Sequence, residues 1–259
     1  MSIYRYETHL HTLEASACAK SWAVEYIPAY REAGYSGIIV TDHFFNGNTN
    51  IPAHLGWAER VRRFCSGYEH AKAAGEREGL AVFFGFEACF IEDEYLIYGL
   101  DKEWLLDNPA IMEWDQRTLF EEVDRLGGLM IQAHPFRERS YNYALYLHPY
   151  AVHGVEVVNG GNPVLFDQRA RLYAEHYNLL MTSGTDIHET SKVGPDTRGM
   201  AFDYPLSSID DFIKAVKENE HYTLLQSNEH RERPRSTEPT LPVHLFEHYP
   251  TGERALGTV

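Results

Sequence analysis

Two histidines one residue apart, His9 and His11, lie near the start of the sequence. If this stretch is extended, both side chains point to the same face, because alternate residues of a strand share a face. Neutral imidazoles paired in this way suit a divalent transition metal. With 14 histidines in 259 residues, roughly one His-x-His pair arises by chance. The pair therefore indicates a metal site only if further ligands accompany it.

Further candidate ligands do occur, and each follows a short apolar run. The residues that share this position are His43, Glu87, His134, Asp186 and His188. Imidazoles and carboxylates, with no requirement for a thiolate, suit Zn, Mn or Fe, and the sequence does not choose among them. We therefore expect two or more metal positions with nitrogen and oxygen ligands.

The apolar runs are predicted to be strands. They lie at 4–12, 37–41, 80–84, 129–133, 155–158, 179–182 and 222–225, with a strand or hairpin at 94–100. Longer helical stretches separate them, which is typical of an α/β fold with a largely parallel sheet. In a barrel of parallel strands, the carboxyl ends of the strands meet at one mouth, where the active site lies. The candidate ligands would meet there.

Helices are predicted at 21–34, around 57–78, from Asp115, at about 163–177 and from Ser208. Asp115 is a predicted N-cap, and Ser208 with Asp211 forms a predicted capping box. From Ser227 the composition shifts to Glu, Arg, His and Pro. We therefore expect a barrel domain at 1–226 and a C-terminal tail or strap at 227–259, with one short strand at 243–246. The sequence leaves open whether this tail covers the barrel, reaches a neighbouring subunit or remains mobile.

The order of the motifs resembles the PHP superfamily, named for polymerase and histidinol phosphatase. The series is His-x-His at 9–11, Thr-Asp-His at 41–43, Glu87, Ala-His-Pro at 133–135 and Gly-Thr-Asp-x-His at 184–188. The resemblance implies a distorted (β/α)7 barrel with two or three divalent metal ions at the C-terminal ends of the strands. It also implies hydrolysis of phosphoesters, the usual activity of the family.

The resemblance also assigns ligands. It implies that one metal is held by His9, His11, Glu87 and Asp186. Glu87 would bridge to a second metal that His134 also binds. His43 and His188 would serve a third position.

The chain departs from the family pattern in two places. The family usually has Asp or His five or six residues after the second histidine of the opening motif, where this chain has Ser16 and Ala17. The nearest carboxylate is Glu14, which either substitutes through a different loop path or leaves the third metal weakly held. Glu156 lies where some members have a Cys or His ligand, and it either coordinates metal or hydrogen-bonds a ligand.

Phosphoester hydrolysis on this site calls for a group that grips phosphate. Arg137 is the predicted clamp, because a guanidinium engages two oxygens; the alternative is a solvated arginine. Lys192 and Arg198 are weaker candidates for substrate binding. By their place in the motif, Asp186 and His188 lie near enough to protonate the leaving group. A bound water molecule is an equal alternative.

The segment 141–150 is rich in tyrosine and follows the His134 strand. It is either a substrate wall at the mouth of the barrel or a helix whose tyrosines pack on the barrel.

Two other functions of the protein stay open: an amidohydrolase on the same scaffold, and a noncatalytic metal-binding module.

The charge balance limits the partners. The formal net charge is −15, which makes long nucleic acid and anionic membranes poor partners. No apolar run is long enough to span a membrane, no signal peptide is recognisable and the three cysteines form no disulfide pattern. We expect a cytoplasmic enzyme acting on a small phosphorylated substrate; the oligomeric state is not readable.

Overall fold

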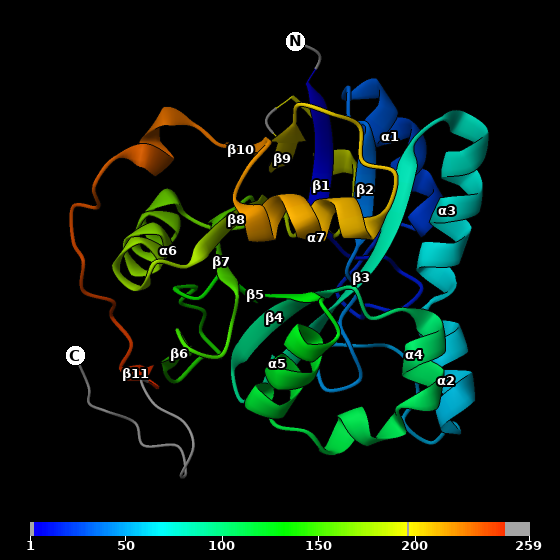
Figure 1. Cartoon of the computed structure of the whole chain (residues 1–259), viewed down its shortest axis with the longest axis horizontal. Coiled ribbons are helices and arrows are strands. Elements are labelled where there is room, and N and C mark those ends of the chain that lie inside the picture. Colours follow the sequence, from blue (N-terminus) through cyan, green and yellow to red (C-terminus); the bar gives the residue numbers. More distant parts are fainter. Residues whose placement is uncertain (1–2, 196, 247–259) are drawn as a thin grey trace.

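A sheet that curves into a nearly closed barrel forms the centre of the computed structural model, which describes residues 3–195 and 197–246 (Figure 1). In this part of the chain the strands follow one another around the ring in the order β1, β2, β3, β4, β5, β7 and β8. A parallel bridge between Leu10 and Ile187 joins the two ends of the ring. The predicted α/β fold with a distorted barrel is confirmed.

The ring strands are short and mostly buried. Their bounds are β1 Tyr4–Leu10, β2 Gly37–Val40, β3 Ala81–Phe90, β4 Asp93–Tyr98, β5 Leu129–Ala133, β7 Gly154–Asn159 and β8 Leu180–Gly184. Both faces of the central strands are covered, so these strands read as continuous apolar runs rather than alternating ones.

Strand β4 is the distortion in the ring. It pairs antiparallel with both β3 and β5, whereas the other ring pairs are parallel. The alternative of a hairpin at 94–100 is therefore correct. The register of the β3–β4 hairpin sets Cys89 opposite Glu94. This register turns the Glu94 end of β4 towards the mouth of the barrel.

One predicted barrel strand is wrong. Residues 222–225 form β10 (Tyr222–Leu225), but this strand pairs antiparallel with β9 (Gly199–Phe202), which pairs antiparallel with β1. The two strands extend the sheet outside the ring. An apolar run shows that a strand exists but does not show the direction of its neighbours.

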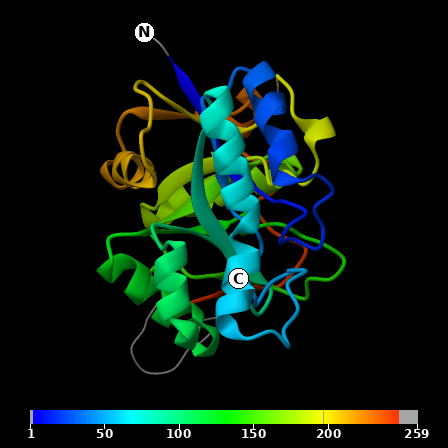
Figure 2. The same ribbon diagram turned by 90° about the vertical axis from the view of Figure 1, so that its right-hand side faces the viewer.

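Helices cover the outer face of the ring, as α1 and α3 show in Figure 2. Their bounds are α1 Tyr26–Glu32, α2 Trp57–Phe64, α3 Ser66–Glu78, α4 Lys102–Asp107, α5 Gln116–Arg125, α6 Val164–Tyr177 and α7 Ile209–Glu218. Short 3-10 helices occupy Ala23–Glu25, Pro109–Glu113, Thr190–Lys192 and Asn228–Arg231. None of the helices described is both long and apolar enough to cross a membrane.

Two predicted helix starts are confirmed. The Asp115 carboxylate accepts a hydrogen bond of 2.8 Å from the Thr118 amide at the start of α5. Ser208 and Asp211 form a reciprocal capping box at the start of α7. Such caps satisfy amide groups that have no partner within the helix.

The described part of the tail follows the surface past α6 and ends in β11 (Val243–Leu245), which pairs in parallel with β6 (Leu145–Leu147) (Figure 1). The short strand predicted at 243–246 is therefore present, while 247–259 lie outside the described residues. Arg169 of α6 joins the tail to the barrel. Its guanidinium pairs with Glu138 at 2.7 Å and donates to the carbonyls of Ser236 and Glu238.

Replacing Arg169 should loosen the tail. Arg169→Ala leaves the Glu138 carboxylate, whose side chain is 11% exposed, without its cation. We therefore expect the free energy of unfolding to fall by about 3 kcal/mol and proteolysis to quicken at 232–242. Denaturant titration and limited proteolysis measure both. Arg125→Ala, which removes an exposed pair with Glu122, should change stability by less than about 0.5 kcal/mol. Equal effects of the two substitutions would contradict the role of Arg169.

Candidate metal centre

Seven of the predicted ligands converge at one end of the ring. They are His9 and His11 at the end of β1, His43 after β2, Glu87 on β3, His134 after β5, and Asp186 and His188 after β8. Burial of so many polar groups is expensive unless each has a partner. Their contacts with one another therefore decide what the site can hold.

The first group surrounds the two imidazoles of β1. His9 Nε2 lies 3.1 Å from His11 Nε2. The same two nitrogens lie 3.2 and 3.5 Å from the Glu87 carboxylate, and 3.6 and 3.2 Å from Asp186 Oδ1. Side-chain atoms of these four residues, from three separate segments of the ring, thus lie close together.

Bonds on the far side of each ring fix the tautomers. His9 Nδ1 is 3.0 Å from Glu156 Oε1, and His11 Nδ1 is 3.2 Å from the Ser16 hydroxyl, which donates its own proton to Asp42. Each Nδ1 is therefore the donor, and each neutral ring presents the Nε2 lone pair to the centre. Two lone pairs facing each other need a cation, or a proton, between them.

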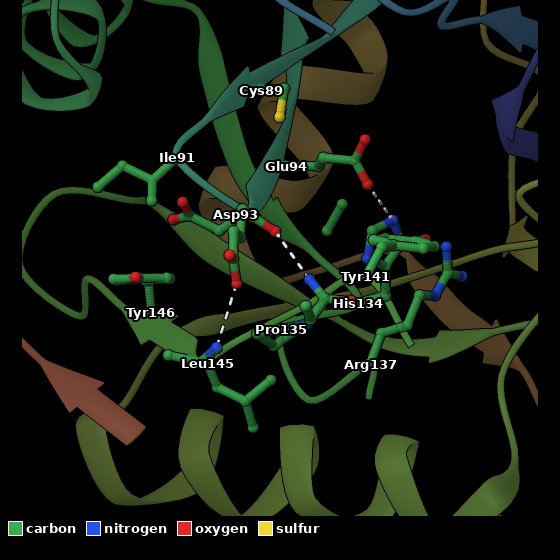
Figure 3. Close-up of a pocket in the computed structure, with 14 residues that line it drawn as sticks. Cys89, Ile91, Asp93, Glu94, His134, Pro135, Arg137, Tyr141, Leu145 and Tyr146 are labelled. Carbon is green, nitrogen blue, oxygen red and sulfur yellow. Dashed lines mark hydrogen bonds and ion pairs between the residues drawn. The ribbon is translucent and has the colours of Figure 1, made fainter. Parts of the chain in front are cut away.

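A second group shares Glu87. The carboxylate lies 3.3 Å from His134 Nε2 and 2.8 Å from His43 Nδ1. Glu94 of β4 lies 3.5 Å from His134 (Figure 3). It also lies 3.7 Å from His43 Nδ1. Sequence reasoning missed Glu94, because only the register of the β3–β4 hairpin carries it to the site.

A third group consists of stacked imidazoles. The ring centroids of His11 and His43 are 4.2 Å apart, and those of His11 and His188 are 4.5 Å apart. His188 Nδ1 donates to the Asp186 carbonyl at 2.9 Å, which leaves its Nε2 as an acceptor. These rings can therefore present nitrogen to a further cation.

Orphaned polar atoms test whether this set fits metal ions. Both oxygens of Glu87 and Nδ1 of His43 are buried, and no donor reaches them in hydrogen-bond geometry within the described residues. Leaving a buried polar atom unpaired costs about 1–3 kcal/mol, and more if it is charged. A divalent cation removes that cost and prefers the imidazole and carboxylate donors found here. The residues fit divalent metal ions; they do not fix the element or the number.

Glu156, one of the predicted ligands, lies outside this set. Its carboxylate contacts His9 Nδ1 and accepts from the His134 amide at 3.2 Å and from Asn159 at 2.8 Å. Of the two alternatives, hydrogen bonding of a ligand is the one that the structure shows. Glu7 has a similar role that the sequence did not reveal: its carboxylate accepts from the amides of His9 and Thr185.

Glu14 was predicted as a ligand, and the structure places it elsewhere. Its carboxylate accepts from the Ala23 amide at 3.0 Å and contacts the exposed His70, so it closes the loop that leads to α1. Cys18 lies four residues further on in the same loop. Burial opposes ionisation of its thiol, but the influence of His188 and His43 outweighs burial and lowers the pKa to about 7.

The predicted phosphate-binding cations lie at different places. Arg137 pairs with Asp186 at 2.6 Å and donates to Asn159 and Asn162. Lys192 is 65% exposed and pairs with Glu189. Arg198 lies in the segment before β9, where its carbonyl accepts from Tyr35. Of the three, Arg137 is the one bonded to a candidate metal ligand.

A cavity of about 360 Å³ opens beside His134 and Glu94. Arg137, Tyr141 and Tyr146 contribute to its wall (Figure 3). The segment 141–150 holds β6 and turns, so the predicted alternative of a helix is wrong. Tyr141 is 68% exposed, as suits a side chain at the rim of the cavity.

Close approach of β8 to β1 requires Gly184. A Cβ at this position would lie 2.6 Å from His9 Cβ and 2.7 Å from Glu156 Oε1. Nearby, His134 and Asp186 adopt φ of 30° and 57°, a region that non-glycine residues rarely occupy and that often marks functional sites. The local backbone is thus shaped around the ligands.

Gly184→Ala should therefore disturb the site from inside. The added methyl group must displace His9 or Glu156, so we expect metal affinity to fall at least about tenfold. Competition with a chelator measures the affinity. Gly194→Ala is the control, because a Cβ there meets no atom within 4 Å. Unchanged affinity in Gly184→Ala would contradict the packing described.

Metal binding should release protons. Burial favours the neutral ring of His9, but Glu156, Glu87 and Asp186 outweigh it and hold its pKa well above the usual value. Burial and the charge of His43 instead lower the pKa of His11. Without metal, one proton therefore occupies the space between the two rings. A metal must displace it, so apparent affinity rises with pH and levels off above the raised pKa.

Calorimetric metal titration in buffers of different ionisation enthalpy counts the protons released. We expect a net release that shrinks as the pH rises. Affinity that is independent of pH across the neutral range would contradict the tautomers assigned above.

No family model matches this chain, and no curated protein sequence matches it. Solved structures do. A two-domain protein of Bacteroides vulgatus, described as containing a predicted PHP-like metal-dependent phosphoesterase, is 18% identical with a TM-score of 0.64. That match covers 86% of this chain and 64% of the other.

Two further structures have the same fold. PsfC of Pseudomonas syringae is 17% identical, with a TM-score of 0.56 over 89% of this chain and 95% of its own. The lesion-specific endonuclease PfuEndoQ of Pyrococcus furiosus is 11% identical, with a TM-score of 0.53 over 86% of this chain and 58% of its own. The chain therefore has the fold of the PHP-like metal-dependent phosphoesterases, as the order of its motifs predicted.

Proposed function

We propose that this protein is a metal-dependent hydrolase of phosphoesters, with a small phosphomonoester as its substrate. The observation that carries the proposal is the sharing of Glu87 by two groups of imidazoles, His9 with His11 and His43 with His134. A carboxylate shared in this way is suited to bridge two cations. Two adjacent cations are a common solution for hydrolysis at phosphorus.

The charge balance of the site favours an anionic substrate. Three carboxylates lie among the candidate ligand atoms, those of Glu87, Glu94 and Asp186. Two divalent cations with Arg137 would carry more positive charge than these carboxylates neutralise. A third cation would widen the difference. The negative charge of a phosphate group compensates this excess positive charge, whereas a neutral amide does not.

The size of the cavity favours a small substrate. About 360 Å³ is near the lower end of the range for small-molecule sites. The net charge of −15 disfavours a long polyanion, so the likeness of fold to an endonuclease does not by itself point to DNA. Tyr141, which is 68% exposed, offers a flat surface for the organic part of the substrate.

The side chains would have distinct roles. Metal ions, when bound, supply activation of water and neutralisation of charge on the phosphoryl oxygens. Arg137 uses three of its N–H groups on Asp186, Asn159 and Asn162, which orients Asp186. A guanidinium has five N–H donors, so two remain for a substrate oxygen. His188 keeps its proton on Nδ1 and is therefore better suited to bind metal than to protonate the leaving group.

A substrate panel tests the proposal. The metal-loaded protein should hydrolyse phosphomonoesters in preference to phosphodiesters and amides, and chelation should abolish the activity. The variant with both His9→Ala and His11→Ala should lose bound metal and turnover together. The matched control replaces the exposed His70 and His221 with Ala and should keep both.

Three outcomes would contradict the proposal. Full phosphatase turnover in the metal-stripped His9→Ala, His11→Ala variant would remove the metals from the mechanism. Preference for amides, with no loss in Arg137→Ala at saturating metal, would favour the amidohydrolase alternative. A protein that binds metal and turns over nothing in the panel would favour a noncatalytic module.

A further inference from the structure

We propose that His230, a residue of the C-terminal tail, is a positioning residue for the guanidinium of Arg137. It acts through Asp167 and two asparagines, so the tail completes the phosphate-binding side of the site. The inference rests on the role proposed above for Arg137. It extends the site into the 3-10 helix at Asn228–Arg231, whose residues are not among those that line the cavity.

The first support is an unbroken line of polar contacts. His230 Nε2 lies 3.3 Å from Asp167 Oδ2. The other oxygen of Asp167 accepts from the Asn162 side chain at 2.9 Å, and the Asn162 oxygen accepts from Arg137 Nε at 2.8 Å. Asp167 Oδ2 also accepts from the Asn159 amide at 3.0 Å. The Asn159 side chain in turn accepts from Arg137 Nη2 at 2.7 Å. Two routes thus lead from the tail to one guanidinium.

The second support is that the contacts have a fixed direction. A carboxylate only accepts and a guanidinium only donates. Asn162 bonds one of each, so its amide nitrogen must point to Asp167 and its oxygen to Arg137. At the other end, the Ser227 amide donates to His230 Nδ1 at 3.3 Å. The proton of the neutral ring is therefore on Nε2, facing Asp167. Each group fixes the orientation of the next.

The third support is burial. His230, Asp167 and Asn159 are all buried. A buried carboxylate depends on its donors, because solvent does not replace one that is lost. Without the His230 ring, Asp167 must turn to find another donor. That movement displaces the Asn162 amide, which Arg137 contacts.

The consequence for the site lies at Arg137. Its third contact is the ion pair with Asp186 Oδ2 at 2.6 Å, so Asp186 and the two asparagines together set the plane of the guanidinium. Recognition of two phosphate oxygens depends on that plane. Loss of the asparagine contacts leaves Arg137 paired with Asp186 but free to rotate about that pair. We therefore expect weaker substrate binding with the metal ligands still in place.

Steady-state kinetics of the metal-loaded full chain test this role. His230→Phe keeps a ring and removes the donor, so KM for a phosphomonoester should rise about tenfold with little change in kcat. His230→Gln places an amide nitrogen near the position of Nε2 and should restore KM towards the wild-type value. Gln168→Ala is the control. It removes a different bond between α6 and the tail, the one to the Glu229 carbonyl, and should leave KM unchanged.

A double-mutant cycle separates positioning from a general loss of stability. In the Arg137→Ala background, His230→Phe should have no further effect on KM, because His230 acts through a group that is already absent. His230→Met also lacks the donor and adapts to irregular space, so it covers failure of His230→Phe to fold. An unchanged KM, or effects on KM that add in full, overturns the role of His230.

Hydrogen exchange at Arg137 gives a readout that does not depend on turnover. The Nε–H of Arg137, which is bonded to Asn162, should give a protected NMR signal in the wild type. In His230→Phe it should exchange at least about tenfold faster. Faster exchange in a protein whose wild type hydrolyses no phosphomonoester leaves the positioning role standing and removes the proposed function. Unchanged exchange with wild-type turnover intact overturns the positioning role alone.

Discussion

Two imidazole lone pairs that face each other across 3.1 Å are the interaction on which this site depends. Glu156 and Ser16 hold one proton of each ring on the outer nitrogens of His9 and His11, so a metal ion or one further proton must separate the inner nitrogens. Around them lie carboxylate oxygens of Glu87 that lack hydrogen-bond donors. Such an arrangement is unfavourable in a dry interior unless a cation occupies it. The remaining contacts of the site make sense as supports for that cation.

The fold supplies these supports from many strands rather than from one segment. Among the seven convergent ligands, β1 carries His9 and β3 carries Glu87, while the others come from the segments that follow β1, β2, β5 and β8. The antiparallel β4 brings Glu94. Glu7 bonds the amides of both His9 and Thr185, so the first and last motifs are fixed to each other. Gly184 permits the contact, and the positive φ of His134 and Asp186 aims their side chains inward.

Much of this was predictable because barrel strands deliver their carboxyl-end residues to one mouth. The seven convergent ligands and the barrel follow from that rule and from motif order. The predictions that failed concern geometry that the spacing of residues in the sequence does not encode. Predicting that Glu94 reaches the site requires the register of the β3–β4 hairpin. Predicting that β10 lies outside the ring requires the direction of its neighbour, β9. Only the folded path of its loop shows that Glu14 turns to the Ala23 amide rather than to the candidate ligands.

The most direct test is a crystal structure of the metal-loaded protein with anomalous scattering recorded at the absorption edge of the metal. The account predicts anomalous peaks within about 2.3 Å of His9 Nε2, His11 Nε2 and the Glu87 carboxylate, with Glu87 shared between two peaks. A site without anomalous density, in which the imidazoles and Glu87 are joined by direct hydrogen bonds, would contradict it.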